Sequence, residues 1–123
     1  MQLPMDHIVI YANDIAESDK FYSRLMGLLG FERTRGFIYQ MENIVFDLRP
    51  ALREGDAHKR GDPGVDHFGF RAPNRATVDK ILMDMLADGF DDANITEFEN
   101  GDYALFISDP DGVRFEVTNY SIK

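Results

Sequence analysis

The two halves of this chain begin with the same short motif. Residues 5–12 (MDHIVIYA) align with residues 65–72 (VDHFGFRA), sixty positions later, and their Asp-His pair and closing Ala are identical. The match continues through Asp-Lys at 19–20 and 79–80, and through Gly-Phe at 30–31 and 89–90 once a one-residue gap is allowed. Self-similarity of this kind is the signature of a duplicated structural unit. We therefore predict two equivalent modules, each opening with one histidine.

The length of the chain limits how these modules can fold. With 123 residues, 44% of them hydrophobic, the chain can form one packed domain but not two independent ones. The segment 50–64 between the halves is rich in charge, Gly and Pro, which is typical of an exposed connector. We predict a single domain over residues 1–123, with module 1 at 5–49, the connector at 50–64 and module 2 at 65–120.

Charge and composition exclude several classes of function. A formal net charge of −9 would repel nucleic acid and anionic membrane surfaces, so we expect a small-molecule ligand. The chain has no cysteine, which excludes disulfides, thiolate nucleophiles and Cys-ligated metals. Its first residues lack the pattern of a signal peptide, and no apolar run reaches membrane-spanning length. We expect a cytoplasmic protein.

One amphipathic helix is predicted in each half. Asn13-Asp14 followed by Glu17 predicts a helix start after a strand at 5–11, and Gly30 is placed to end that helix. A second helix is expected between Asn74 and Gly89. Apolar residues at helical spacing support both: Phe21, Tyr22, Leu25, Leu28 and Leu29 in the first, and Val78, Ile81, Leu82, Met85 and Leu86 in the second.

Each helix is followed by apolar stretches that are too short for another helix. These stretches, at 37–41 and 44–48 and again at 103–108 and 113–118, are typical of paired strands. Glu42-Asn43 and Asp109-Pro110-Asp111-Gly112 supply the turns between them. The predicted fold class is α+β, with two tandem β-α-β-β-β modules.

Strand alternation separates core residues from candidate site residues. Residues two apart share a face of a sheet, so Ile8 and Ile10 in the core leave His7 on the other face. The same argument places the following residues off the core face: Val9, Tyr11, Val45, Asp47, Arg49, His67, Gly69, Arg71, Arg114, Glu116 and Thr118. Each half therefore offers one histidine and one carboxylate, His7 with Asp47 and His67 with Glu116.

Two imidazoles and two carboxylates form a suitable ligand set for a divalent cation. Ordinary structural roles remain open: each histidine could be a hydrogen-bonded strand residue, and Glu116 could be an exposed residue on a half-solvated sheet. Asp47 is short and of a type depleted in strands, so it could instead be a pocket residue beside the metal.

Two arginines share faces with these candidates. Arg49 and Arg71 could grip an anionic substrate, or could reach water from strand ends. Val9 and Tyr11 are predicted to line the pocket wall. The basic cluster of Arg53, His58, Lys59 and Arg60 is predicted to be a solvated loop.

At this point the sequence resembles the vicinal oxygen chelate superfamily, which includes glyoxalase I, methylmalonyl-CoA epimerase, type I extradiol dioxygenases and bleomycin-resistance proteins. The resemblance rests on residues 6–10 (DHIVI), the helix from Phe21-Tyr22 to Gly30-Phe31, His67, and residues 109–116 (DPDGVRFE). It implies a cup-like mixed sheet around a divalent metal (Ni, Zn, Co, Mn or Fe), commonly in a homodimer. His7, His67 and Glu116 match ligand positions, and Asp47 falls where many members carry Glu or Gln.

The resemblance implies a metal-dependent lyase or isomerase of the glyoxalase-like type, which stabilises an enediolate or enolate while Glu116 or Asp47 moves a proton. If Asp47 is not a ligand, two His and one carboxylate resemble the site of non-haem Fe(II) oxygenases, and an extradiol-type dioxygenase is the alternative. No histidine precedes Tyr103 closely, unlike in the extradiol enzymes. A metal-free drug- or metabolite-binding resistance protein is the third hypothesis, since a charge of −9 would suit a cationic drug.

Overall fold

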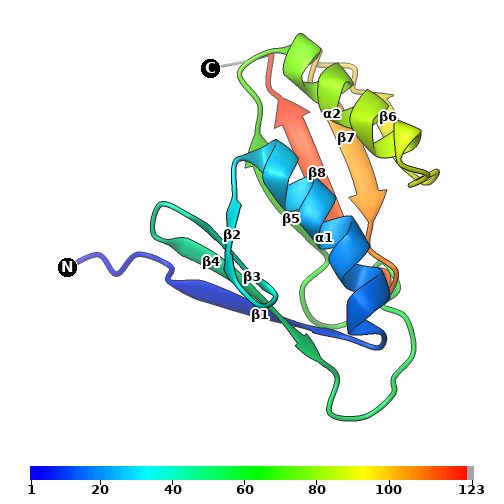
Figure 1. The fold of residues 1–123 in the computed structure, drawn as a ribbon. Helices are drawn as coiled ribbons and strands as arrows, with labels where there is room; N and C mark the ends of the chain where they lie inside the picture. The colour runs from blue at the N-terminus through cyan, green and yellow to red at the C-terminus, as the bar shows by residue number, and fades with distance from the viewer. Residues whose placement is uncertain (122–123) are drawn as a thin grey trace. The chain divides into compact units, whose positions relative to one another are not determined.

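The computed structural model describes residues 1–121 and divides into two compact units, residues 1–56 (unit 1) and residues from 57 onward (unit 2). The division falls inside the predicted connector. Each unit contains a four-stranded mixed sheet and one helix, in the order strand, helix and three strands (Figure 1). The α+β fold class and the repeated β-α-β-β-β order are confirmed. Among residues 1–121, no helix combines the length and apolar character needed to cross a membrane.

Unit 1 is built from β1 (His7–Ala12), α1 (Ile15–Leu29), β2 (Glu32–Arg35), β3 (Ile38–Met41) and β4 (Ile44–Pro50). Its strand order is β1-β4-β3-β2, with β1 parallel to β4 and the other neighbours antiparallel. The predicted helix ends are confirmed. The Asp14 side chain accepts a hydrogen bond of 3.1 Å from the backbone N–H of Glu17, and Gly30 closes α1 at φ 99°.

Unit 2 repeats this arrangement with β5 (His67–Arg71), α2 (Arg75–Ala87), β6 (Asn94–Glu97), β7 (Tyr103–Ser108) and β8 (Arg114–Asn119). Its strand order is β5-β8-β7-β6, with β5 parallel to β8. The Asn74 side chain accepts a hydrogen bond of 2.8 Å from the backbone N–H of Thr77, so the predicted cap of α2 is also confirmed. The register of the parallel strands is the same in both units, and it positions the candidate site residues.

Two residues near the middle of the connector are held by hydrogen bonds, Gly55 to unit 1 and His58 to unit 2. The side chain of Asn13 donates to the carbonyl of Gly55 at 2.9 Å and accepts from its N–H at 3.1 Å. Three residues later, the backbone N–H of His58 donates to the carbonyl of Asp111 at 2.7 Å. A Cβ atom at Gly112, where φ is 86°, would lie 2.3 Å from the carbonyl oxygen of His58. Part of the segment predicted to be solvated therefore packs against the turn between β7 and β8.

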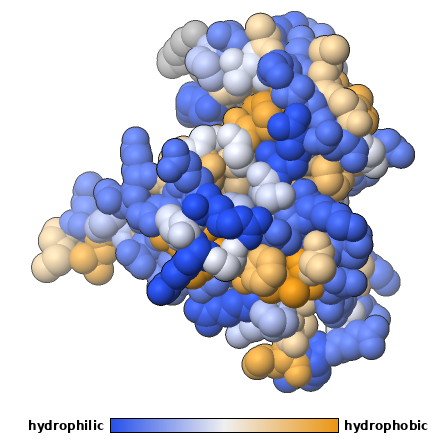
Figure 2. Space-filling model, viewed as in Figure 1, coloured by the Kyte–Doolittle hydropathy of each residue, from blue (hydrophilic) through white to orange (hydrophobic). Residues whose placement is uncertain are grey.

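On the face shown in Figure 2, hydrophilic residues predominate and hydrophobic ones form small separate patches. The large side chains buried in the described residues include Phe21, Tyr22 and Leu25 of α1 and Phe115 and Val117 of β8. These residues were predicted to lie in the core, and their burial leaves the polar positions of the same strands facing away from it.

A tyrosine–aspartate link is repeated in the two units. The Tyr39 hydroxyl donates to Asp19, and Arg33 donates two further hydrogen bonds to the same carboxylate at 2.8 and 3.0 Å. In unit 2 the Tyr103 hydroxyl donates to Asp79 at 2.5 Å. Asp19 and Asp79 are sixty positions apart, so they are equivalent residues of the repeat. In each unit the bond joins the helix to a strand, α1 to β3 and α2 to β7.

We expect Tyr39 to make stability sensitive to alkali. Burial, followed by the hydrogen bond to Asp19, raises the pKa of Tyr39 far above its ordinary value of 10. The unfolded chain loses this proton near pH 10 while the folded chain keeps it, so the stabilisation present below pH 10 is lost as the pH rises further. In urea denaturation at pH 9 to 11, the free energy of unfolding should fall more steeply for the wild type than for Tyr39→Phe. Tyr120→Phe, at a more exposed tyrosine, should keep the wild-type slope, and equal slopes for all three proteins would contradict this prediction.

Candidate functional site

Unit 2 brings His67 and Glu116 together. In the parallel pairing of β5 with β8, His67 lies opposite Arg114 and Gly69 lies opposite Glu116. Glu116 is therefore on the same face as His67, two positions further along the sheet. The Nε2 atom of His67 lies 3.4 Å from Oε1 of Glu116, and the Glu116 side chain is only 18% exposed.

Neighbouring side chains hold this pair in position. Nδ1 of His67 lies 2.7 Å from Oδ2 of Asp66, a contact that lowers the pKa of Asp66, and Nε2 is thereby left facing Glu116. Asp66 precedes β5, so it does not follow the strand alternation that would turn it away from His67. On the other side, the Thr118 hydroxyl donates to Oε2 of Glu116 at 2.5 Å. Carboxylates that accept from the second nitrogen of a ligand imidazole commonly orient it in metal sites.

The donor atoms fit a divalent metal. Two donors that each lie about 2.1 Å from one ion are about 3.0 to 3.4 Å apart for angles of 90 to 109°. The separation between Nε2 of His67 and Oε1 of Glu116 is 3.4 Å. One imidazole nitrogen and one carboxylate oxygen are thus available at a spacing that suits shared coordination.

Unit 1 repeats the histidine but not the pair. Nδ1 of His7 lies 2.8 Å from Oδ2 of Asp6, as in unit 2. Asp47 lies opposite Val9, the register position that Glu116 has in unit 2. Its carboxylate, however, is bound by Arg49, whose Nη2 and Nε lie 2.6 and 2.8 Å from Oδ2. The shorter acid is therefore engaged by an arginine of its own strand.

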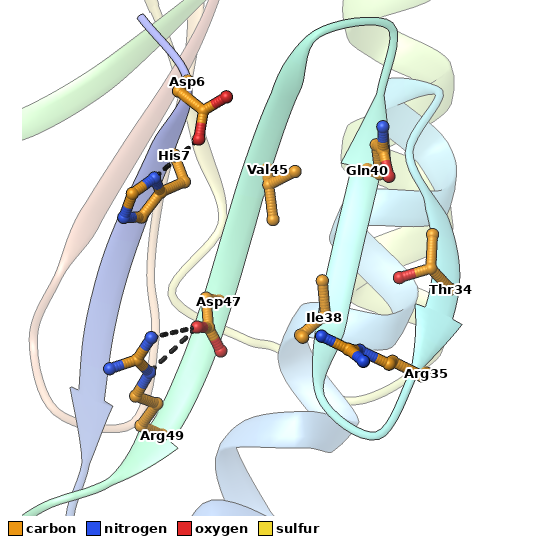
Figure 3. Close-up of a pocket in the computed structure, with 9 residues that line it drawn as sticks. All are labelled: Asp6, His7, Thr34, Arg35, Ile38, Gln40, Val45, Asp47 and Arg49. Carbon is orange, nitrogen blue, oxygen red and sulfur yellow. Dashed lines mark hydrogen bonds and ion pairs between the residues drawn. The ribbon is translucent and has the colours of Figure 1, made fainter.

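A hollow of about 500 Å³ surrounds this part of unit 1. The residues that line it come from the start of β1 and from the other three strands of the sheet (Figure 3). They are Asp6, His7, Thr34, Arg35, Ile38, Gln40, Val45, Asp47 and Arg49. The sequence predicted His7, Asp47 and Arg49 as site residues, but Arg35 was not singled out.

Unit 2 has a hollow of similar size beside Glu116. Its volume is about 500 Å³, and it is lined by Glu116 and Thr118 of β8 together with Phe98, Glu99, Asn100, Asp102 and Tyr120. Arg71, a predicted substrate-binding residue, stacks its guanidinium 4.6 Å from the centre of the Tyr120 ring. Arg71 is also exposed, so the contact gives it an aromatic partner at the surface and does not separate the two roles predicted from the sequence.

The remaining predicted pocket residues lie on β1. Tyr11 is 49% exposed and lines a smaller hollow with residues 51–55. Val9 is half-buried opposite Asp47 and is not among the residues that line the hollow of His7. Within residues 1–121, no three His, Asp or Glu side chains lie close enough together to hold a metal ion. The structure thus brings His67 and Glu116 together in unit 2, whereas Asp47, at the equivalent position of unit 1, is bound by Arg49.

Comparison with known proteins identifies the family. The sequence profile of the Glyoxalase/Bleomycin resistance protein/Dioxygenase superfamily matches residues 5–117. The chain belongs to this superfamily. The match spans both modules, including each Asp-His motif and Glu116, and it confirms the resemblance seen in the sequence.

Superfamily relatives resemble this chain along nearly its full length. An uncharacterized protein of Bacillus subtilis, YqjT, is 24% identical over 92% of this chain and 96% of its own. Among solved structures, a candidate glyoxalase from Bacillus halodurans has a TM-score of 0.77 at 24% identity, covering 94% of this chain and 95% of that one. A lactoylglutathione lyase from Agrobacterium tumefaciens has a TM-score of 0.68 at 20% identity, covering 97% and 95%. These similarities establish the glyoxalase fold.

Proposed function

We propose that this protein is a metal-dependent enzyme of the glyoxalase-like type, a lyase or isomerase that acts on a small anionic substrate. The metal ligands in this proposal are His67 and Glu116 of unit 2 and His7 and Asp47 of unit 1. The observation that carries it is the His67–Glu116 pair, with donor atoms 3.4 Å apart and with Asp66 and Thr118 holding the outer side of each group. The chemistry of this donor set suits Ni, Zn, Co, Mn or Fe.

A divalent metal at such a site would polarise substrate oxygens and stabilise negative charge on them. The chain must then supply a base that moves a proton between substrate carbon atoms. Glu116 and Asp47 are the carboxylates available for this step. Thr118 occupies one oxygen of Glu116, which leaves the other for a ligand or a proton. Arg49 holds Asp47 and would orient the anionic part of the substrate next to it.

The known relatives support more than one reaction class. A lactoylglutathione lyase shares the fold, and so does an oxidase, ChaP-H2, with a TM-score of 0.66 at 16% identity. Similarity at this level supports the fold alone, so the choice between lyase and oxygenase depends on the site. A homodimer, which is common in the superfamily, is part of this proposal.

Metal loading tests the proposal. The purified chain would be stripped with a chelator, reloaded separately with Ni²⁺, Zn²⁺, Co²⁺, Mn²⁺ or Fe²⁺, and assayed for bound metal by elemental analysis. We expect stoichiometric metal and metal-dependent turnover of an α-hydroxy thiohemiacetal or an acyl-CoA. Oxygen consumption with Fe²⁺ and a catechol would instead assign an extradiol-type dioxygenase. A chain that binds none of these metals would rule out both enzymes.

The hollow of unit 2 favours one further candidate, a metal-free binding protein. Its lining combines three carboxylates, Glu99, Asp102 and Glu116, with the aromatic rings of Phe98 and Tyr120. Such a lining suits an organic cation. Binding of a cationic drug by the chelator-treated protein, together with an absence of metal binding, would favour this candidate over the enzyme.

A further inference from the structure

Arg35 reaches the hollow of unit 1 because the sheet is irregular at β2. Residues two apart on a regular strand share a face, so Arg33 and Arg35 would point the same way. The pairing of β2 with β3 shifts between them: Arg33 lies opposite Tyr39, whereas Arg35 lies opposite Ile38. Bulges of this kind re-aim side chains, often beside active sites.

The shift separates the two arginines by face. Arg33 binds Asp19 and stacks 4.9 Å from the centre of the Tyr39 ring, on the side of the sheet that α1 covers. Arg35 lies next to Ile38, which in turn lies opposite Asp47. Figure 3 shows Arg35 extending from β2 past Ile38 toward β4, with Arg49 approaching Asp47 from the side of β1. Two guanidinium groups therefore line one hollow of about 500 Å³.

The two arginines of this hollow differ in their partners. Arg49 forms an ion pair with Asp47, and Oδ2 of Asp6 lies 2.8 Å from Nδ1 of His7. Arg35 is exposed and has no hydrogen bond or ion pair to any other residue in the part of the chain that the structure describes. Its five N–H donors are thus available to a ligand, and Thr34 adds a hydroxyl to the same lining.

We propose that Arg35 is a specificity-determining residue which, together with Arg49, binds a carboxylate or phosphate group of the substrate in the hollow of unit 1. A guanidinium offers two parallel donors that match the oxygens of such groups. The anion would compete with Asp47 for Arg49, so its arrival releases the Asp47 carboxylate. The inference rests on the proposed function only in assigning the anion to the substrate of that enzyme.

Titration of the metal-free full chain with inorganic phosphate, followed by amide chemical shifts in NMR spectra, tests the anion site. We expect saturable shifts at Arg35, Arg49 and neighbouring residues of the hollow. Arg35→Met should weaken phosphate binding at least about tenfold, since hydrogen bonds to charged groups contribute about 1.5 to 3 kcal/mol. Arg35→Lys, which keeps the charge but not the paired donors, should give an intermediate affinity.

Arg53→Met is the matched control, because Arg53 is an exposed arginine of the same unit that lies outside this hollow. Its phosphate affinity should equal that of the wild type. Equal weakening in both Met variants, or unchanged binding in Arg35→Met, would overturn the inference. Phosphate binding that depends on Arg35 in a chain that binds no metal would leave the inference standing and reject only the proposed enzyme. Metal-dependent turnover together with unchanged phosphate binding in Arg35→Met would support the proposed enzyme and reject the anion site.

Discussion

Replacement of Glu116 by glutamine is expected to remove stoichiometric metal binding and to reduce turnover by more than the about 10- to 100-fold that loss of an outer-shell partner costs. Gln has the same size and can still accept the hydrogen bond from Thr118, so the hollow should keep its shape. It lacks the negative charge that a divalent cation requires beside His67. Calorimetric titration of the metal-free variant with Co²⁺ or Zn²⁺ measures the effect directly.

Two further variants test whether the loss of metal binding is specific to Glu116. Glu99→Gln changes an exposed carboxylate of the same hollow and should leave metal affinity unchanged. Asp66→Asn changes the group behind His67, which also accepts a hydrogen bond from the backbone N–H of Gly61, and we expect it to weaken metal binding by about 10- to 100-fold without abolishing it. If Glu116→Gln binds metal as the wild type does, Glu116 is not a ligand and the proposed site is wrong.

Replacement of Phe115 by alanine should cause a large loss of stability. The Phe115 side chain is fully buried, and its ring centre lies 5.6 Å from that of Phe68 and 6.4 Å from that of Phe70. Truncating a buried phenylalanine leaves a cavity and costs about 3 to 5 kcal/mol. That is a large fraction of the about 5 to 15 kcal/mol by which a typical domain is stable.

Urea denaturation followed by circular dichroism checks this expectation. Phe98→Ala is the matched control, because Phe98 is 45% exposed and its loss should change the free energy of unfolding by no more than about 0.5 kcal/mol. Similar midpoints for the two variants would show that Phe115 is not a core residue. Because Phe115 stands directly before Glu116, partial unfolding of β8 would also separate Glu116 from His67.

Much of the fold could be predicted from local sequence signals. The caps at Asp14, Gly30 and Asn74 depend on side chains and backbone angles within a few residues, so their sequence pattern was sufficient. Strand alternation placed His67 and Glu116 on one face, and the structure shows them together. The short strands β2 and β6 could not be located, because neither shows a regular alternation; all four residues of β2 are exposed.

The details of the site required the structure. Side-chain pairing decides that Asp47 binds Arg49 whereas Glu116 lies beside His67. Strand alternation placed Arg49 on the face of Asp47, but it could not show whether Arg49 binds that acid or a ligand. Arg35 was missed because β2 was not located, and even a regular strand there would have placed Arg35 on the same face as Arg33. The contact of Asp66 with His67 could have been anticipated from the sequence, because an identical Asp precedes His in both halves of the repeat.

Hydrogen bonds made by the connector shorten the link between the duplicated modules. Asn13 ties Gly55 to unit 1, and Asp111 ties His58 to unit 2. Asp56 and Ala57 are the two residues between these anchors, and the two units divide there. A long, charged loop would behave as a flexible tether. Here only two residues separate the anchors, so the covalent link between the modules is much shorter than the 15 residues of the predicted connector.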